Sequence, residues 1–277
     1  MSIAFVNNVK TVLLLGALMG LVVGVGYTLG GASAILPALV IALLMNLGAF
    51  FFSDKLAIAA MRGQEVTGGK LYDIVDELRQ RAGLPMPRVY VCPQQAPNAF
   101  ATGRSPRKAA VAVTEGALQL LTREELEGVM AHELAHVKNR DTLTSTVAAT
   151  VGGLMGMLAY GIFLFGGSNR EGGNPLLVIA AVLAGAIGAA IIKAMLSRSR
   201  EFVADADGAA IAGSPDGLIN ALRKLETYAK RIPMHNPNPA ANNLFIIEPL
   251  TGGKTLSDLF ASHPPTEKRV AALMTLR

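Results

Sequence analysis

Two of the chain's four histidines stand four residues apart in the stretch AHELAH, residues 131–136, with a glutamate directly after the first. Residues four apart lie on one face of a helix, so His132 and His136 can direct ring nitrogens at one metal ion while Glu133 lies beside the same pocket. A catalytic zinc site needs a third protein ligand and an open position for water. The spacing predicts a zinc site, or else a helix that carries two histidines by chance.

A third ligand is expected in the stretch SRSREFVADADGA, residues 197–209. Glu201 and Asp205 are four residues apart, and the neighbouring helical positions are apolar or small, which places both carboxylates toward a core. Buried carboxylates are costly unless they bind a cation or accept hydrogen bonds. Glu201 is therefore the candidate ligand; the alternative is a solvated helix end in which Glu201 pairs with Arg198 or Arg200.

The elements that must position these residues can be read from local patterns. Thr122 followed by Glu125 fits a capping box, which predicts that the AHELAH helix begins after Thr122. Gly68–Arg81 has the apolar spacing of an amphipathic helix. Three short apolar runs predict a small antiparallel meander; they begin at Arg88, Asn98 and Ala109. Asn98 and the following AFATG stretch are the candidate edge strand, where an extended peptide substrate could add by main-chain hydrogen bonds.

The composition places these elements at a membrane. Hydrophobic residues make up 51% of the chain and charged residues 16%, which is more apolar surface than a water-soluble core needs. Segments without charge must approach roughly 20 residues to cross a bilayer. Four do so: Thr11–Leu29, Ala32–Phe52, Thr142–Gly167 and Asn174–Ile192. The first lacks a clear cleavage site and does not resemble a signal peptide; the last two could instead form a buried helical hairpin.

The basic residues predict the orientation. Ser53–Asp141 holds 12 Lys and Arg and Lys193–Arg277 holds 11, whereas the loop between the last two spans holds only Arg170. The positive-inside tendency places the two basic segments in the cytoplasm. The expected fold is α+β and mainly helical, an integral membrane protein with four transmembrane helices. Its expected parts are an N-terminal hairpin over 1–53, a first catalytic part with the small sheet over 54–141, a second transmembrane or membrane-associated hairpin over 142–192, and a second catalytic part over 193–277.

Other classes of protein fit less well. The net charge is +5, but aromatic residues are 5%, Trp is absent and no Lys/Arg-rich block appears, so a nucleic-acid partner is not expected. The single cysteine, Cys92, cannot form an intrachain disulfide, which fits a reducing compartment. We expect Cys92 to be a small packed residue after a strand rather than a nucleophile, because a thiol protease would need its own placed base.

Taken together, these residues resemble the HtpX heat-shock membrane zinc metalloproteases, which share a peptidase family with the CAAX prenyl proteases. The matching stretches are NAFATG, VMAHELAHVKNRDTL, SRSREFVADADGA, NNLFIIEPL and LFASHPPTEKRVAAL, and with the N-terminal hairpin they cover nearly the whole chain. The resemblance implies a cytoplasmic zincin-like (gluzincin) domain that hydrolyses peptide bonds of damaged membrane proteins at the inner membrane during stress. Asn243 departs from the family pattern, which has a histidine there.

The resemblance also implies roles for individual residues. His132, His136 and Glu201 would hold one Zn²⁺ per chain, Glu133 would be the catalytic base, and Asp205 would support the ligands. His263 and Arg269 would lie close to the active site, where either could assist the developing oxyanion. His263 could instead cap the C-terminal helix, and Arg269 could tie that helix to Asp205 or Glu201.

Two alternative functions stay open at this point. One is a prenyl-protein-type processing endopeptidase, for which four spans are few. The other is a non-catalytic membrane scaffold stapled by zinc, against which the presence of Glu133 argues. The expected partners are polypeptide substrates and the lipid bilayer, and the oligomeric state is left open.

Overall fold

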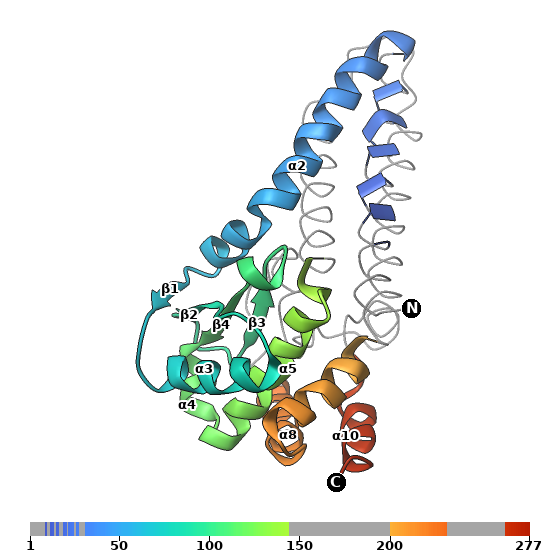
Figure 1. Ribbon diagram of the computed structural model, residues 1–277. Helices are drawn as coiled ribbons and strands as arrows, with labels where there is room; N and C mark the ends of the chain where they lie inside the picture. The colour runs from blue at the N-terminus through green and yellow to red at the C-terminus, as the bar shows by residue number, and fades with distance from the viewer. Residues whose placement is uncertain are drawn as a thin grey trace.

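The computed structural model describes residues 31–143, 200–231 and 264–277, together with short helical stretches between residues 9 and 27. Figure 1 shows one long helix, α2, rising from a body in which α3 and α5 lie against a small sheet and α8 packs on α5. The expected third and fourth spans lie outside the described residues except for their flanks, and so do His263 and Asn243.

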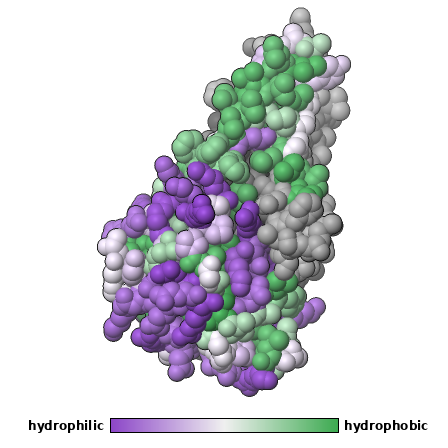
Figure 2. All heavy atoms as spheres, viewed as in Figure 1, coloured by the Kyte–Doolittle hydropathy of each residue, from purple (hydrophilic) through white to green (hydrophobic). Residues whose placement is uncertain are grey.

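Helix α2 runs over Ile35–Ala60 and follows a short 3-10 turn, η1, over Gly31–Ala34. Its first part, Gly31–Phe52, is the one segment within the described residues that is long and apolar enough to cross a membrane, and it coincides with the expected second span. Large apolar side chains along it are exposed, among them Leu36 (69%) and Leu44 (62%). Figure 2 shows the resulting green shaft above a largely purple body. A bilayer would cover this apolar surface, which water would leave unfavourably solvated.

The preceding helical stretches pack beside α2. The Asn46 side-chain amide donates a hydrogen bond to the Leu15 carbonyl (3.1 Å), and Val22 and Ala42 form a small buried cluster. These contacts are those of a helical hairpin, the arrangement expected for the first two spans.

The sheet differs from the predicted antiparallel meander. Its four strands are β1 (Gln64–Val66), β2 (Arg88–Cys92), β3 (Ala99–Thr102) and β4 (Ala110–Thr114), in the order β1-β2-β4-β3. β2 and β4 are parallel, whereas β1–β2 and β3–β4 are antiparallel. The prediction of a meander was wrong because β4, whose AVAVT side chains are all buried, takes the place beside β2. A strand buried on both faces occupies a central position, and this leaves β3 at the edge.

Helix α5 (Arg123–Lys138) lies at the centre of the helical layer and packs against α3, α8 and β3. The other helices are α3 (Lys70–Ala82), α4 (Glu115–Leu120), α8 (Asp216–Arg231), α10 (Thr266–Met274) and a helix over residues 200–212. Two glycines allow close helix contact. A Cβ on Gly128 would lie 2.4 Å from the Leu218 nitrogen of α8, and one on Gly208 would lie 2.9 Å from the His132 Cα. The helix that carries Glu201 therefore lies directly against α5.

The predicted capping box of α5 is confirmed. The Thr122 side chain accepts a hydrogen bond from the Glu125 nitrogen (3.3 Å), and the Glu125 carboxylate accepts one from the Thr122 nitrogen (2.8 Å). Two backbone donors that a helix start leaves unpaired are thereby satisfied. Lys224 of α8 also donates to Glu125 (2.6 Å), which joins the start of α5 to its neighbour.

Candidate metal centre

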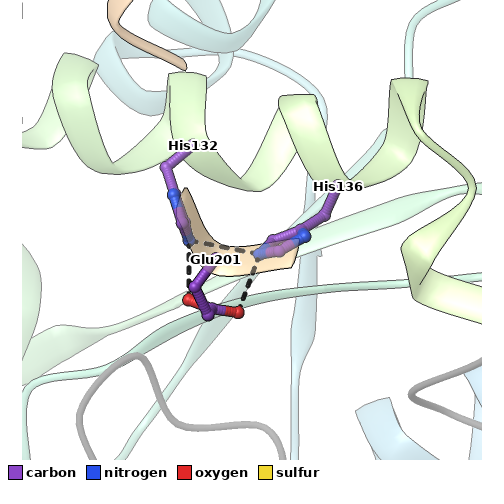
Figure 3. Close-up of side chains that lie close together, drawn as sticks. All are labelled: His132, His136 and Glu201. Carbon is purple, nitrogen blue, oxygen red and sulfur yellow. Dashed lines mark hydrogen bonds and ion pairs between the residues drawn. The ribbon is translucent and has the colours of Figure 1, made fainter. Parts of the chain in front are cut away.

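His132, His136 and Glu201 come together beneath α5 (Figure 3), and their ligand atoms all lie within 4.8 Å of one another. The two Nε2 atoms are 3.2 Å apart. The Glu201 oxygens lie 3.6 Å from the Nε2 of His132 and 3.4 Å from that of His136. His132 and Glu201 are almost fully buried. Glu201 is therefore not the solvated helix end that its arginine neighbours allowed.

These distances fit a metal ion. Tetrahedral ligands at about 2.0–2.1 Å from zinc lie roughly 3.3–3.4 Å from one another. The two Nε2 atoms here are 3.2 Å apart, and each lies 3.4–3.6 Å from one of the two Glu201 oxygens. The two histidines supply nitrogen donors and the carboxylate supplies an oxygen donor, a set that zinc accepts in sites with an open fourth position. The donor set and its geometry therefore fit a catalytic zinc ion.

The Nδ1 atom of each histidine lies next to a carboxylate. The Nδ1 of His132 lies 3.0 Å from an Asp205 oxygen, and the Nδ1 of His136 lies 3.0 Å from an Asp141 oxygen. A proton on each Nδ1 leaves the Nε2 lone pairs directed at the metal position, and the carboxylates make the imidazoles more basic. This is the tautomer that ligation requires.

Asp141 is a site residue that the sequence reasoning missed. It lies beyond the end of α5, where Asn139 is the C-cap and Arg140 adopts a left-handed backbone conformation (φ 57°). This turn brings Asp141 back toward His136. The signal in the sequence was an acidic residue five positions after the second histidine and directly before an apolar segment.

Arg269 of α10 closes the site from the opposite side. Its Nε donates to one Asp205 oxygen (2.9 Å) and its Nη2 to the other (2.6 Å), while its Nη1 lies 3.4 Å from Glu201. Burial raises the pKa of Asp205, but the charge of Arg269 outweighs it and lowers that pKa to about 2. Arg269, 1% exposed, thus ties α10 to the helix over residues 200–212.

Acidic side chains surround the histidines. Among the described residues, Glu133, Asp141, Glu201 and Asp205 are buried carboxylates, and Arg269 and Arg200 lie close to them, Arg200 at 3.8 Å from Asp141. These acidic surroundings also affect the histidines. Burial lowers the pKa of His136, but hydrogen bonds to Asp141 and Glu201 outweigh burial and raise it to about 10. The site thus attracts a cation, whether a proton or a metal.

The remaining candidate residues lie in different places. Glu133 follows His132 in α5 and is buried. Burial lowers the pKa of Arg269, but nearby carboxylates, Glu133 among them, outweigh burial and raise that pKa. Asn98 is buried just before β3, and its backbone nitrogen donates to the Thr114 hydroxyl (2.8 Å). His263 lies outside the described residues. Cys92 is fully buried at the end of β2, and burial raises its thiol pKa to about 11, as suits a packed residue rather than a nucleophile.

Comparisons with known proteins show the family of this chain. The sequence profile of Peptidase family M48 matches residues 65–277. A "Protease HtpX homolog" of Syntrophotalea carbinolica is 48% identical over 96% of this chain and 98% of its own length. Another of Nostoc punctiforme is 49% identical over 98% of this chain and 96% of its own. The crystal structure of S. mikatae Ste24p has a similar fold, with a TM-score of 0.56 at 17% identity over 98% of this chain and 66% of that one. This chain therefore belongs to peptidase family M48, among the HtpX-type membrane-bound metalloproteases.

Proposed function

We propose that this chain is a zinc endopeptidase that cleaves misfolded or damaged membrane proteins at the cytoplasmic face of the inner membrane. The observation that carries the proposal is the cluster of His132, His136 and Glu201, whose ligand atoms lie within 4.8 Å of one another in a largely buried site next to Glu133. A structural zinc site would have no need for a further buried acid, Glu133, next to a ligand.

The chain's own residues divide the catalytic work. Zinc bound by His132, His136 and Glu201 would polarise a water molecule and stabilise the developing oxyanion. Glu133 accepts the proton of the attacking water and later delivers it to the leaving nitrogen. Asp205 and Asp141 hold the two imidazoles in the ligating tautomer. Arg269 keeps Asp205 ionised and lies 3.4 Å from Glu201, so it supports the pocket rather than titrating during the reaction.

The substrate would bind as an extended strand along β3. This strand lies at the edge of the sheet and α5 packs against it, so an added peptide would run beside the metal ligands. Main-chain hydrogen bonds of this kind tolerate many sequences, which suits unfolded segments. In this proposal Asn98, at the beginning of β3, positions the start of the substrate-binding edge.

The membrane arrangement follows from the charge distribution and from α2. Four spans would divide the chain at the boundaries given above, with residues 54–141 and 193–277 in the cytoplasm. Asp141, which holds His136, directly precedes the expected third span, so the metal would lie near the membrane surface. A reporter fused at Arg104 should therefore give a cytoplasmic signal, and a periplasmic signal would reverse the proposed orientation.

The catalytic role is tested with Glu133→Gln. We expect the variant to keep its zinc and to cleave casein or a membrane-protein substrate about 100- to 10,000-fold more slowly, because general acid–base catalysis is lost. Glu127→Gln, on the exposed side of the same helix, is the matched control. Unchanged cleavage by a zinc-loaded Glu133→Gln protein would remove Glu133 from the mechanism.

The ligand set is tested separately with Glu201→Ala. Loss of one of three protein ligands should lower zinc retention during dialysis against a chelator, while Glu127→Ala should retain zinc like the wild type. Full retention by Glu201→Ala would exclude Glu201 as a ligand. Cleavage of unprenylated substrates in the same assays separates general proteolysis from prenyl-protein processing.

A further inference from the structure

The turn between β3 and β4 is fixed to α2 near the end of the helix's apolar segment. The Arg104 guanidinium lies 5.0 Å from the centroid of the Phe51 ring, and its Nη1 donates to the Phe51 carbonyl (3.3 Å). Phe51 is the last residue but one of the apolar segment Gly31–Phe52. The turn therefore lies where a spanning α2 would leave the hydrocarbon.

A second contact holds the other side of the same turn. The buried Thr142 hydroxyl donates to the Gly103 carbonyl (2.9 Å), and Thr142 is the first residue of the expected third span. Gly103 has a positive φ (+125°), and a Cβ there would lie 2.4 Å from the Lys108 carbonyl oxygen. The turn is thus tight and is anchored beside two segments that lead toward the membrane.

Basic side chains lie on and near the β3–β4 turn. Arg104, Arg107 and Lys108 belong to the turn, the last two in the short 3-10 helix η2 (Pro106–Lys108), and both are exposed. Lys55 lies one helical turn after Phe51 on α2, with its Nζ 5.9 Å from the Phe52 ring. We call these four residues the basic rim. Figure 2 shows hydrophilic residues directly below the apolar shaft of α2.

The basic rim has no acidic counterpart in the described part of the chain. None of its four residues forms an ion pair there, and the acid nearest along α2, Asp54, is bound to Arg88 (2.9 Å). Lys55, Arg107 and Lys108 of the rim are exposed, and Arg104 is held against the exposed Phe51. Lipid phosphates lie at this depth of a bilayer, and Lys and Arg near the ends of spans extend toward them.

We propose that the basic rim binds the phosphate headgroups of anionic phospholipids. The proposal rests on α2 spanning the membrane as proposed above, and it goes beyond the proteolytic function. Each Lys or Arg near an anionic surface raises affinity about fivefold. Bound headgroups would hold the β3–β4 turn against the bilayer. Since β3 is the edge strand beside α5, the substrate-binding edge would then stay close to segments that emerge from the membrane.

The test measures lipid binding to the full chain in a neutral detergent, in the Glu133→Gln background so that self-cleavage does not occur. Native mass spectrometry would follow titration with phosphatidylglycerol or phosphatidylcholine. We expect preferential binding of phosphatidylglycerol, and about a 25-fold loss of that affinity in Arg107→Gln/Lys108→Gln, since two charges are removed. Lys70→Gln/Arg223→Gln removes two exposed charges away from the rim and should bind like the parent.

Three results would overturn the proposal. These are equal binding of both lipids, undiminished phosphatidylglycerol binding by the rim variant, and displacement of the lipid by inorganic phosphate at equal concentration. Melting temperature and zinc content check that the variants fold. If the double variant does not fold, the single variants Arg107→Gln and Lys108→Gln replace it, and each should lose about fivefold in affinity for phosphatidylglycerol. Cleavage is measured separately on protein that retains Glu133. The lipid-binding result therefore does not depend on whether the proposed proteolytic function is correct.

Discussion

Asp141 acts on the metal centre through His136, whose Nδ1 lies 3.0 Å from its carboxylate. Asp141→Asn keeps an acceptor oxygen but removes the charge that makes the imidazole more basic. We expect zinc affinity to fall roughly 10- to 100-fold, as for other residues that orient metal-bound histidines. Competition with a chromogenic chelator measures the change.

The matched control for this change is Asp207→Asn. Asp207 accepts a hydrogen bond from the Asn139 side chain (2.7 Å), close to the same helix end, but has no recorded contact with either histidine. Its replacement removes one negative charge from the same region and should alter zinc affinity little. If both variants lose affinity equally, general charge rather than the Asp141–His136 contact sets the effect.

Asp205 and Asp141 show what could be predicted of the site. Asp205 is four residues from Glu201 on one helix, so its place followed from helical periodicity. Asp141 depends on the left-handed conformation of Arg140, which an arginine rarely adopts. No local pattern indicates such a turn, and the contact of Asp141 with His136 became visible only in three dimensions.

At the scale of elements, Gly208 determines how closely the helix over residues 200–212 approaches α5. A Cβ at Gly208 would lie 2.9 Å from both the nitrogen and the Cα of His132, so an alanine must push the two helices apart. Because Glu201 is on the moving helix, Gly208→Ala should weaken zinc binding as well as lower the melting temperature. Gly68→Ala, with no atom near the added Cβ, is the control and should change neither. Wild-type zinc affinity in Gly208→Ala would show that the approach of the helices does not set the ligand geometry.

The start of α5 should show a pH-dependent contribution to stability. Burial raises the pKa of Glu125, but hydrogen bonds from Lys224 and Thr122 outweigh it and lower the pKa below its ordinary value. A carboxyl group whose pKa is lowered by folding stabilises the protein above its unfolded pKa, and this contribution disappears as the pH falls through the folded value. Glu125→Gln should thus lower the free energy of unfolding by about 1 kcal/mol at pH 7.

The same substitution should matter progressively less as the pH falls through the lowered pKa of Glu125, because the wild-type carboxyl group then becomes protonated too. Denaturant unfolding at pH 7 and near pH 3.5 measures the difference between Glu125→Gln and wild type at each pH. Glu127→Gln, whose partner Arg123 is largely exposed, serves as control and should show little difference at either pH. If Glu125→Gln lowers the free energy of unfolding by the same amount at both pH values, ionisation of Glu125 is not the cause.

The elements also differ in how well the sequence predicted them. Helices α3 and α5 were placed within two residues at their starts, since their apolar spacing and the Thr122 cap are local signals. β1 was missed because Gln64–Val66 is short, mostly exposed and without alternation of apolar residues. The strand order depends on pairing between segments far apart in the chain, which no local signal records.

At the scale of the whole molecule, the metal centre joins three separate segments. α5 supplies the histidines, the helix over residues 200–212 supplies Glu201, and α10 supplies Arg269. Without a cation, the buried carboxylates of Glu133, Asp141, Glu201 and Asp205 repel one another, which opposes the association of these segments. Removal of zinc by a chelator should therefore lower the melting temperature. Zinc at about 1,000 times its dissociation constant stabilises a protein by about 4 kcal/mol, which corresponds to roughly 8–16 °C for a chain of this size. Differential scanning fluorimetry of chelated and zinc-reloaded protein measures the shift, and Glu201→Ala should show little of it. Equal melting temperatures of chelated and zinc-loaded wild type would mean that protein contacts alone hold the three segments together.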